Sequence, residues 1–178
     1  MAPAVGQTIR VRVEELTPDW QGLGKIDGVP VRLDGTVWPG DEAEAVLTAR
    51  SRQHGHWFAR VRRVISSAVP REPSFCELAS ACGGCRGSGI PYEAQTAWKA
   101  AYLQSLFPQA GFTASPRALG YRGKVKWIVG RGRDGRVQPG FYRPGSHKFL
   151  PITHCPLLAP ALAQLEESLP SLLQDIEP

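Results

Sequence analysis

The alternation of apolar and polar residues predicts short β-strands through the first third of the chain. Thr8–Val13 alternates residue by residue, which is typical of a strand with one buried face. Asp27-Gly28 separates two further apolar runs and indicates a two-residue hairpin turn. About five short strands in ~60 residues predict a small closed barrel of the OB type. The predicted strands are Thr8–Val13, Gly22–Ile26, Val29–Leu33, Glu42–Leu47 and His56–Ile65.

Beyond a proline-bearing linker at Pro70–Ser74, the pattern predicts a different kind of unit. Ala94, Ala97, Trp98, Ala101 and Leu106 form much of an apolar stripe at helical spacing, which Gly111 should end. We therefore expect an all-β OB-like barrel over residues 1–71, followed by a small α+β domain over residues 72–178. The predicted elements of the second domain are a helix over Pro91–Phe107, antiparallel strands over Lys124–Val129, Val137–Tyr142 and Lys148–Ile152, and a helical tail over Leu157–Leu173 broken at Pro170.

Charge is strongly segregated along the chain, although the formal net charge is only +5. Residues 50–75 carry six basic side chains and one acidic, and residues 117–148 carry nine basic and one acidic. The tail from 149 to 178 has no Lys or Arg and four acidic residues. Local fields of this strength attract polyanions, and a solvated basic face without a partner is the alternative. Glu166, in the acidic tail, is expected to have no measurable role in such binding.

The composition, 42% hydrophobic and 21% charged, is that of a globular protein. The opening residues have no basic start followed by an apolar run, and no stretch approaches the ~20 apolar residues of a membrane helix. We therefore expect a cytoplasmic, monomeric protein without membrane contact. In that compartment thiols stay reduced, so grouped cysteines indicate metal binding sooner than disulfides.

The four cysteines, Cys76, Cys82, Cys85 and Cys155, form a three-plus-one pattern. Three thiolates close in sequence, with a fourth supplied from far along the chain, suit a [4Fe-4S] cluster in which each iron takes one terminal cysteine. The two glycines between Cys82 and Cys85 let backbone amides approach the cluster sulfides. A structural zinc site usually offers two compact pairs, and four unconnected structural cysteines are the plainest alternative. The spacing favours the cluster over both.

Basic residues on the predicted meander and at one end of the barrel are candidates for phosphate contacts. Alternation places Lys124 and Lys126 on one face of their predicted strand. Arg60 and Arg62 share a face of the last barrel strand in the same way. A basic groove with aromatic platforms is typical of barrels that bind single-stranded nucleic acid. The candidate RNA contacts are Arg60, Arg62, Arg122, Lys124, Lys126, Arg131, Arg133 and Arg143.

Several short motifs occur together in an order that resembles a known family. Gly22-Leu23-Gly24-Lys25-Ile26, Asp27-Gly28-Val29-Pro30-Val31 and Trp38-Pro39-Gly40-Asp41 resemble a TRAM domain, an RNA-binding OB-like barrel. A TRAM domain followed by Cys-x5-Cys-Gly-Gly-Cys resembles the bacterial RNA uracil-5-methyltransferases that modify large-subunit ribosomal RNA and carry a [4Fe-4S] cluster. The resemblance covers roughly residues 6–165 and departs at Gly123, where the family more often has asparagine. Its further motifs are Tyr92-Glu93-Ala94-Gln95, Trp98-Lys99, Gly120-Tyr121-Arg122-Gly123-Lys124, Gly140-Phe141-Tyr142-Arg143 and His154-Cys155-Pro156-Leu157.

The resemblance implies that the chain binds and positions ribosomal RNA for methylation at uracil C5. In this family, a Rossmann-like domain binds S-adenosylmethionine, and a cysteine thiolate attacks the uracil ring. The chain has no Gly-x-Gly-x-x-Gly motif after a strand, and its four cysteines are all assigned to the cluster. We therefore expect no catalytic residue here and S-adenosylmethionine only with a separate methyltransferase domain or partner. A fragment, or a natural protein without the catalytic half, fits this pattern.

Two other functions stay open at this stage. One is a stand-alone RNA-binding module in which zinc or the cluster is a structural staple. The other is an electron-transfer iron–sulfur protein, which needs an exposed cluster and a reversible redox couple. In the favoured hypothesis, the cluster ties the segment Cys76–Cys85 to the far end of the meander.

Overall fold

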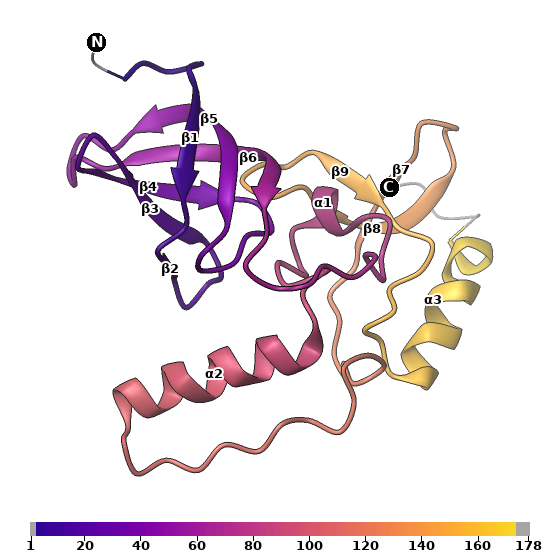
Figure 1. Cartoon of the computed structure of the whole chain (residues 1–178). Coiled ribbons are helices and arrows are strands. Elements are labelled where there is room, and N and C mark those ends of the chain that lie inside the picture. Colours follow the sequence, from indigo (N-terminus) through magenta and orange to yellow (C-terminus); the bar gives the residue numbers. More distant parts are fainter. Residues whose placement is uncertain (1–2, 174–178) are drawn as a thin grey trace. The chain divides into compact units, whose positions relative to one another are not determined.

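The structure, a computed structural model, describes residues 3–173 (Figure 1). Within that range the chain forms two compact units. The first comprises the residues up to Pro73 together with Arg86–Gln95, and the second comprises Ser74–Cys85 together with the residues from Thr96 onward. The division expected at residues 71 and 72 stays a prediction.

The first unit contains a six-stranded sheet with the order β1-β5-β6-β4-β3-β2. Its neighbouring strands are antiparallel, except that β4 and β6 run parallel. All five expected strands are present, with ends shifted by a few residues, and β2 is an additional short strand. The strands are β1 (Thr8–Arg12), β2 (Glu15–Leu16), β3 (Gly22–Ile26), β4 (Val29–Asp34), β5 (Glu42–Arg50) and β6 (Trp57–Ser66).

The alternating side chains of these strands form the core of the first unit. Ile9 and Val11 of β1 are buried, whereas the residues between and beside them are exposed. Val31 and Leu33 of β4 and Leu47 of β5 are almost completely buried. Burying a side chain of this size contributes about 1.5–3 kcal/mol, so the alternation determines which face of each strand turns inward.

Glycines allow the hairpin and the curling of this sheet. Asp27 and Gly28, between β3 and β4, both have positive φ, 49° and 78°, as a type I′ turn requires. Gly24 of β3 lies so close to the carbonyl oxygen of Arg12 and the side chain of Val11 that a Cβ would have no room. The Glu14 amide donates a 2.7 Å hydrogen bond to the Leu23 carbonyl. Strands β1 and β3 thus approach each other, as in an OB-like barrel.

A buried carboxylate connects the Trp38–Asp41 turn to the chain that follows β6. The side chain of Asp41 is 0% exposed and forms an ion pair with Arg71. Its Oδ2 accepts a 2.7 Å hydrogen bond from the Trp38 amide, and its Oδ1 accepts a 2.9 Å bond from the Ala68 amide. This is the physical role of the aspartate in the Trp-Pro-Gly-Asp motif: it joins a turn to a segment that is distant in sequence.

The second unit contains a three-stranded antiparallel sheet in the order β7 (Ile128–Arg131), β8 (Val137–Tyr142) and β9 (Phe149–Pro151). The meander is therefore confirmed, but the expectation that its first strand begins at Lys124 was wrong. The Arg122 amide donates to the Leu157 carbonyl at 2.8 Å, and the Ala159 amide donates to the Arg122 carbonyl at 3.0 Å. Because Arg122 pairs with this later segment, the chain joins β8 only at Ile128.

The expected long helix exists as α2 (Tyr92–Leu106), but it ends before Gly111, and its apolar stripe faces no core. None of its residues is buried. Leu106 is 54% exposed, and Phe107, which follows the helix, is 62% exposed. The rings of Trp98 and Tyr102, one helical turn apart, stack on each other with centroids 5.3 Å apart. Helical spacing thus predicted the helix correctly, but not its burial.

The chain ends, within the described range, in α3 (Pro160–Leu172). Pro160 starts the helix, where its missing amide costs nothing. Pro170 was expected to break the helix, but it lies inside its last turn, and the Leu173 amide still donates to the Leu169 carbonyl at 3.0 Å. Among residues 3–173, no helix is both long enough and apolar enough to cross a membrane.

Candidate metal centre

The segment that carries the first three cysteines is a tight, internally hydrogen-bonded loop around one short helix, α1 (Ala79–Cys82). Before the helix, the Ser74 hydroxyl donates to the Cys76 carbonyl at 2.6 Å. After it, Gly83 takes a left-handed conformation with φ 67°. A Cβ on Gly83 would also collide with Pro144. The glycine therefore ends α1 and turns the chain between Cys82 and Cys85.

Cys155 arrives from the other end of the second unit, in the loop between β9 and α3. Its carbonyl accepts a 3.1 Å hydrogen bond from the Leu158 amide. Its own amide donates a 2.7 Å hydrogen bond to Oε2 of Glu166 in α3. Together with the Arg122 pairing, these bonds hold the loop in place from two sides.

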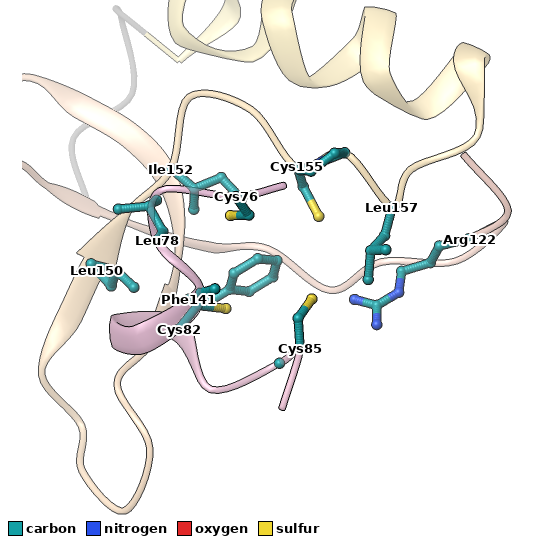
Figure 2. Close-up of a pocket in the computed structure, with 13 residues that line it drawn as sticks. Cys76, Leu78, Cys82, Cys85, Arg122, Phe141, Leu150, Ile152, Cys155 and Leu157 are labelled. Atoms are coloured by element: carbon teal, nitrogen blue, oxygen red, sulfur yellow. The ribbon is translucent and has the colours of Figure 1, made fainter. Parts of the chain in front are cut away.

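The four cysteines line one pocket of the second unit (Figure 2). Figure 2 shows their sulfur atoms around a common space, with Phe141, Leu150 and Leu157 among the apolar neighbours. The pocket has about 450 Å³ of empty space, part of it open to solvent. Each cysteine is half-buried. The fold thus brings Cys155 to the three cysteines that are close in sequence.

The four cysteine side chains surround an open space and do not converge on one point at which a single metal ion could bind. Among residues 3–173, no group of three or more His, Cys, Asp or Glu side chains lies close enough together to hold a metal ion. The donor set of the pocket is four thiols with apolar neighbours, and each thiol could serve a different metal atom of a larger group.

The surroundings of the pocket disfavour free thiolates. Burial, and after it the neighbouring thiols of Cys155, Cys82 and Cys76, raise the pKa of Cys85 to about 11, although the Arg122 guanidinium opposes this shift. Burial also raises the pKa of Cys155, and the Glu166 carboxylate adds to this effect. Both shifts favour the neutral thiol at Cys85 and Cys155, so binding a metal group there would release protons.

Arg122 differs from the other candidate RNA contacts. Its side chain is half-buried and lines the cysteine pocket. Figure 2 shows its guanidinium on the side of the pocket where Cys85 and Leu157 lie. Among the residues that line the pocket, Arg122 is the one with a cationic side chain.

The remaining candidate contacts are exposed and lie in both units. Arg60 and Arg62 are exposed on β6 of the first unit. In the second unit, Lys124 and Lys126 lie in irregular chain before β7, so the strand alternation expected for them does not apply. Exposed positions at the end of β7, in the following turn and after β8 hold Arg131, Arg133 and Arg143.

The tip of the β5–β6 hairpin, at the start of the strand that carries Arg60 and Arg62, adds aromatic and cationic groups. The guanidinium of Arg50 lies 5.6 Å from the centre of the Trp57 ring. The rings of His54 and His56 stack at 5.9 Å, and Phe58 contacts His56 edge-on at 4.7 Å. Trp57 itself is 5% exposed and belongs to the core. Stacked rings and a nearby guanidinium are groups that can hold nucleic-acid bases.

Sequence reasoning missed Glu166, which is only 2% exposed. Its expected lack of a role in RNA binding stays a prediction, but its burial shows that it is part of the packing of the second unit. Its position was readable from helical spacing, because Leu162, Glu166, Leu169 and Leu173 follow one another at intervals of four, three and four along one face. A single acid within an apolar stripe is the signal that could have identified it.

Comparison with known proteins gives a family match within the first unit and relatives that align along most of the chain. The TRAM domain family matches residues 4–56. An uncharacterized RNA methyltransferase of Parasynechococcus marenigrum is 32% identical over 94% of this chain and 37% of its own length. One from Thermosynechococcus vestitus is 34% identical over 95% of this chain and 39% of its own length. The 23S rRNA (uracil(1939)-C(5))-methyltransferase RlmD of Yersinia enterocolitica is 30% identical over 89% of this chain and 37% of its own length. The chain thus spans well under half the length of these relatives.

Proposed function

We propose that this chain, a TRAM-containing part of the RNA methyltransferase family, binds ribosomal RNA and holds a [4Fe-4S] cluster on its four cysteines. The observation that carries the proposal is the convergence of Cys76, Cys82, Cys85 and Cys155 on one pocket. The RNA part rests on the TRAM match and on the rRNA methyltransferase named among the relatives. A cytoplasmic protein fits both parts, because thiols stay reduced there.

The residues around the pocket fit such a cluster. Four thiolates give one terminal ligand to each iron, and the apolar walls limit the access of water and oxidants. The guanidinium of Arg122 would offset part of the negative charge of a thiolate-bound cluster. The Gly83 amide donates to the Ala79 carbonyl at 3.2 Å, whereas Gly84, the other glycine between Cys82 and Cys85, lines the pocket, where its amide can donate to sulfur.

The role that we assign to the cluster is structural. When bound, it supplies four metal–thiolate bonds between segments that are far apart in sequence. The loop of Cys76–Cys85 and the loop of Cys155 come from opposite ends of the second unit, so the bonds would close a long stretch of chain. The exposed basic residues of that unit, including Lys124, Lys126 and Arg143, lie on the chain between them. Joining the two loops would therefore restrain the segments that carry the basic side chains.

Iron and sulfide analysis tests the cluster. Anaerobically purified protein should be brown, with absorption near ~400 nm and about four irons and four sulfides per chain. Cys155→Ser should lose most of this content, because it removes the one ligand from the far loop. One zinc per chain and no sulfide in fresh protein would contradict the proposal.

The salt dependence of RNA binding tests the RNA-binding part of the proposal. Four or five phosphate contacts predict that the logarithm of the RNA-binding constant falls with the logarithm of the salt concentration with a slope of roughly −3. Removing one contact should reduce the magnitude of this slope by about 0.7. Lys124→Ala and Lys126→Ala should each do so on structured ribosomal fragments, without changing the cluster absorption. Glu167→Ala is the matched control, since Glu167 is an exposed acid beside the buried Glu166. Binding that is absent at low salt, with the cluster intact, would contradict this part.

The methyl transfer itself we assign to a separate domain that binds S-adenosylmethionine, and α2 is the surface on which we expect it to dock. The relatives are more than twice as long as this chain. Helix α2 buries none of its residues, and Leu106 and Phe107 are more than half exposed. Apolar groups of that kind mark protein interaction sites. Phe107→Glu should weaken binding of the remaining portion of the Thermosynechococcus relative by about tenfold or more. Val5→Glu, also at an exposed apolar position, should not.

A further inference from the structure

Glu166 is a buried carboxylate that faces the loop of one cysteine. It lies on α3 with 2% exposure. Its Oε2 accepts a 2.7 Å hydrogen bond from the Cys155 amide, and its Oε1 accepts a 3.3 Å bond from Nε1 of Trp127. The two oxygens thus join three separate parts of the second unit: α3, the Cys155 loop and the segment before β7.

The burial of the Glu166 carboxylate costs free energy that an aliphatic side chain at this position would not. Burying a carboxylate is costly unless hydrogen bonds or a cation compensate for the lost water. Two N–H donors reach Glu166, and no ion pair to it is found among the described residues. A leucine would continue the apolar stripe of α3 at lower cost. The position therefore carries an acid where packing alone would favour an aliphatic side chain.

We propose that Glu166 is a positioning residue for the cluster, which holds the Cys155 backbone and places a negative charge beside that ligand. This inference rests on the proposed cluster. By accepting a hydrogen bond from the Cys155 amide, the carboxylate sets the direction in which this loop presents its thiolate. The same bond occupies an N–H that could otherwise donate to a cluster sulfide. Both the missing donor and the added negative charge make reduction of the cluster less favourable.

Arg122 and Glu166 then have opposite effects on the reduction potential of the cluster. Arg122 lines the pocket directly, on the side of Cys85, and favours negative charge there. Glu166 acts through the Cys155 amide and disfavours it. The expected effect of each substitution on the reduction potential therefore has a definite direction: upward for loss of Glu166 and downward for loss of Arg122.

The test compares Glu166→Gln and Glu166→Ala in the whole chain, loaded with iron and sulfide, with Glu167→Gln as the exposed control. Loss of an outer ligand partner typically costs about 10–100-fold in metal affinity. We expect the cluster of Glu166→Ala to decay about tenfold faster in the presence of an iron chelator, and the near-isosteric Gln to restore part of the lifetime. Both variants should have a more positive reduction potential than wild type. Trp127→Phe should shift it in the same direction by less.

Several outcomes separate this inference from the proposed function. If wild-type protein takes up no iron and sulfide, the cluster proposal itself fails. If wild type is loaded, and the Glu166 variants keep its potential and cluster lifetime while only their melting temperature falls, Glu166 is purely structural and the inference is wrong. Should Glu166→Ala fail to fold, Glu166→Gln decides the question, because it preserves the volume while it removes the charge and one of the two acceptor oxygens.

Discussion

Replacing Asp41 with asparagine removes the charge from a carboxylate that is completely buried in the first unit. If the new NH₂ takes the place of Oδ2, it faces the N–H donors of both Trp38 and Arg71, and only the Ala68 amide keeps its acceptor, Oδ1. Breaking a buried ion pair by removing one partner costs about 3–5 kcal/mol. The side chain of Arg71 is 27% exposed and can regain water, so we expect the lower end, about 3 kcal/mol.

The loss should be visible in the first unit alone. A change of 1 kcal/mol shifts the melting temperature of a domain of this size by about 4–8 °C, so Asp41→Asn should lower it by about 12 °C or more. Hydrogen exchange of peptides from β1 and β4, followed across temperature, reports on this unit without interference from the second. Arg71→Ala should cost a comparable amount, about 3 kcal/mol, because it leaves the completely buried Asp41 carboxylate with only its two backbone donors.

Asp134→Asn provides the control. The side chain of Asp134 is 55% exposed, and its nearest cation, Arg136, is 3.9 Å away. Its removal should change the free energy of unfolding by less than about 0.5 kcal/mol. If Asp41→Asn unfolds within about 1 kcal/mol of wild type, the buried carboxylate is not what joins the Trp38–Asp41 turn to the chain after β6, and the reasoning is refuted.

Three further predictions concern the cysteine pocket and the chemistry. In the metal-free protein, the rate of alkylation of Cys85 should keep rising with pH up to about 11, because burial and the neighbouring thiols raise its pKa. Mass spectrometry of the labelled peptide measures this rate, and a plateau near the ordinary thiol pKa would contradict the prediction. Gly83→Ala should reduce iron uptake, since φ is 67° and Pro144 occupies the space of a Cβ, whereas Gly84→Ala, which would contact only the Cys82 sulfur at 3.4 Å, should be milder. The 178-residue chain alone should neither bind S-adenosylmethionine in calorimetry nor methylate RNA, and a methylated uridine product would overturn that expectation.

The local pattern of the sequence determined the strands, the hairpin and the existence of the helices. Strand alternation such as Thr8–Arg12 depends on a period of two, and the Asp27-Gly28 turn depends on the conformational freedom of one residue pair. Both are properties of residues that are neighbours in sequence, so they can be predicted without knowledge of the tertiary structure. The grouping of Cys155 with Cys76, Cys82 and Cys85 in one pocket was also predicted, because three thiols close in sequence and a fourth far along the chain form a spacing typical of one shared site.

Only the tertiary structure decided which side chains each element faces. Glu166 and Glu167 are adjacent acids in the same tail, yet one is buried against the Cys155 amide and the other is exposed, because α3 packs on one face only. Lys124 and Lys126 lie outside the strand expected for them because the backbone of Arg122 pairs with Leu157 and Ala159 instead. Helix α2 has apolar residues at helical spacing but nothing in the described chain buries them. Spacing reports which side chains share a face, whereas burial and hydrogen-bond partners depend on contacts with residues far away in sequence.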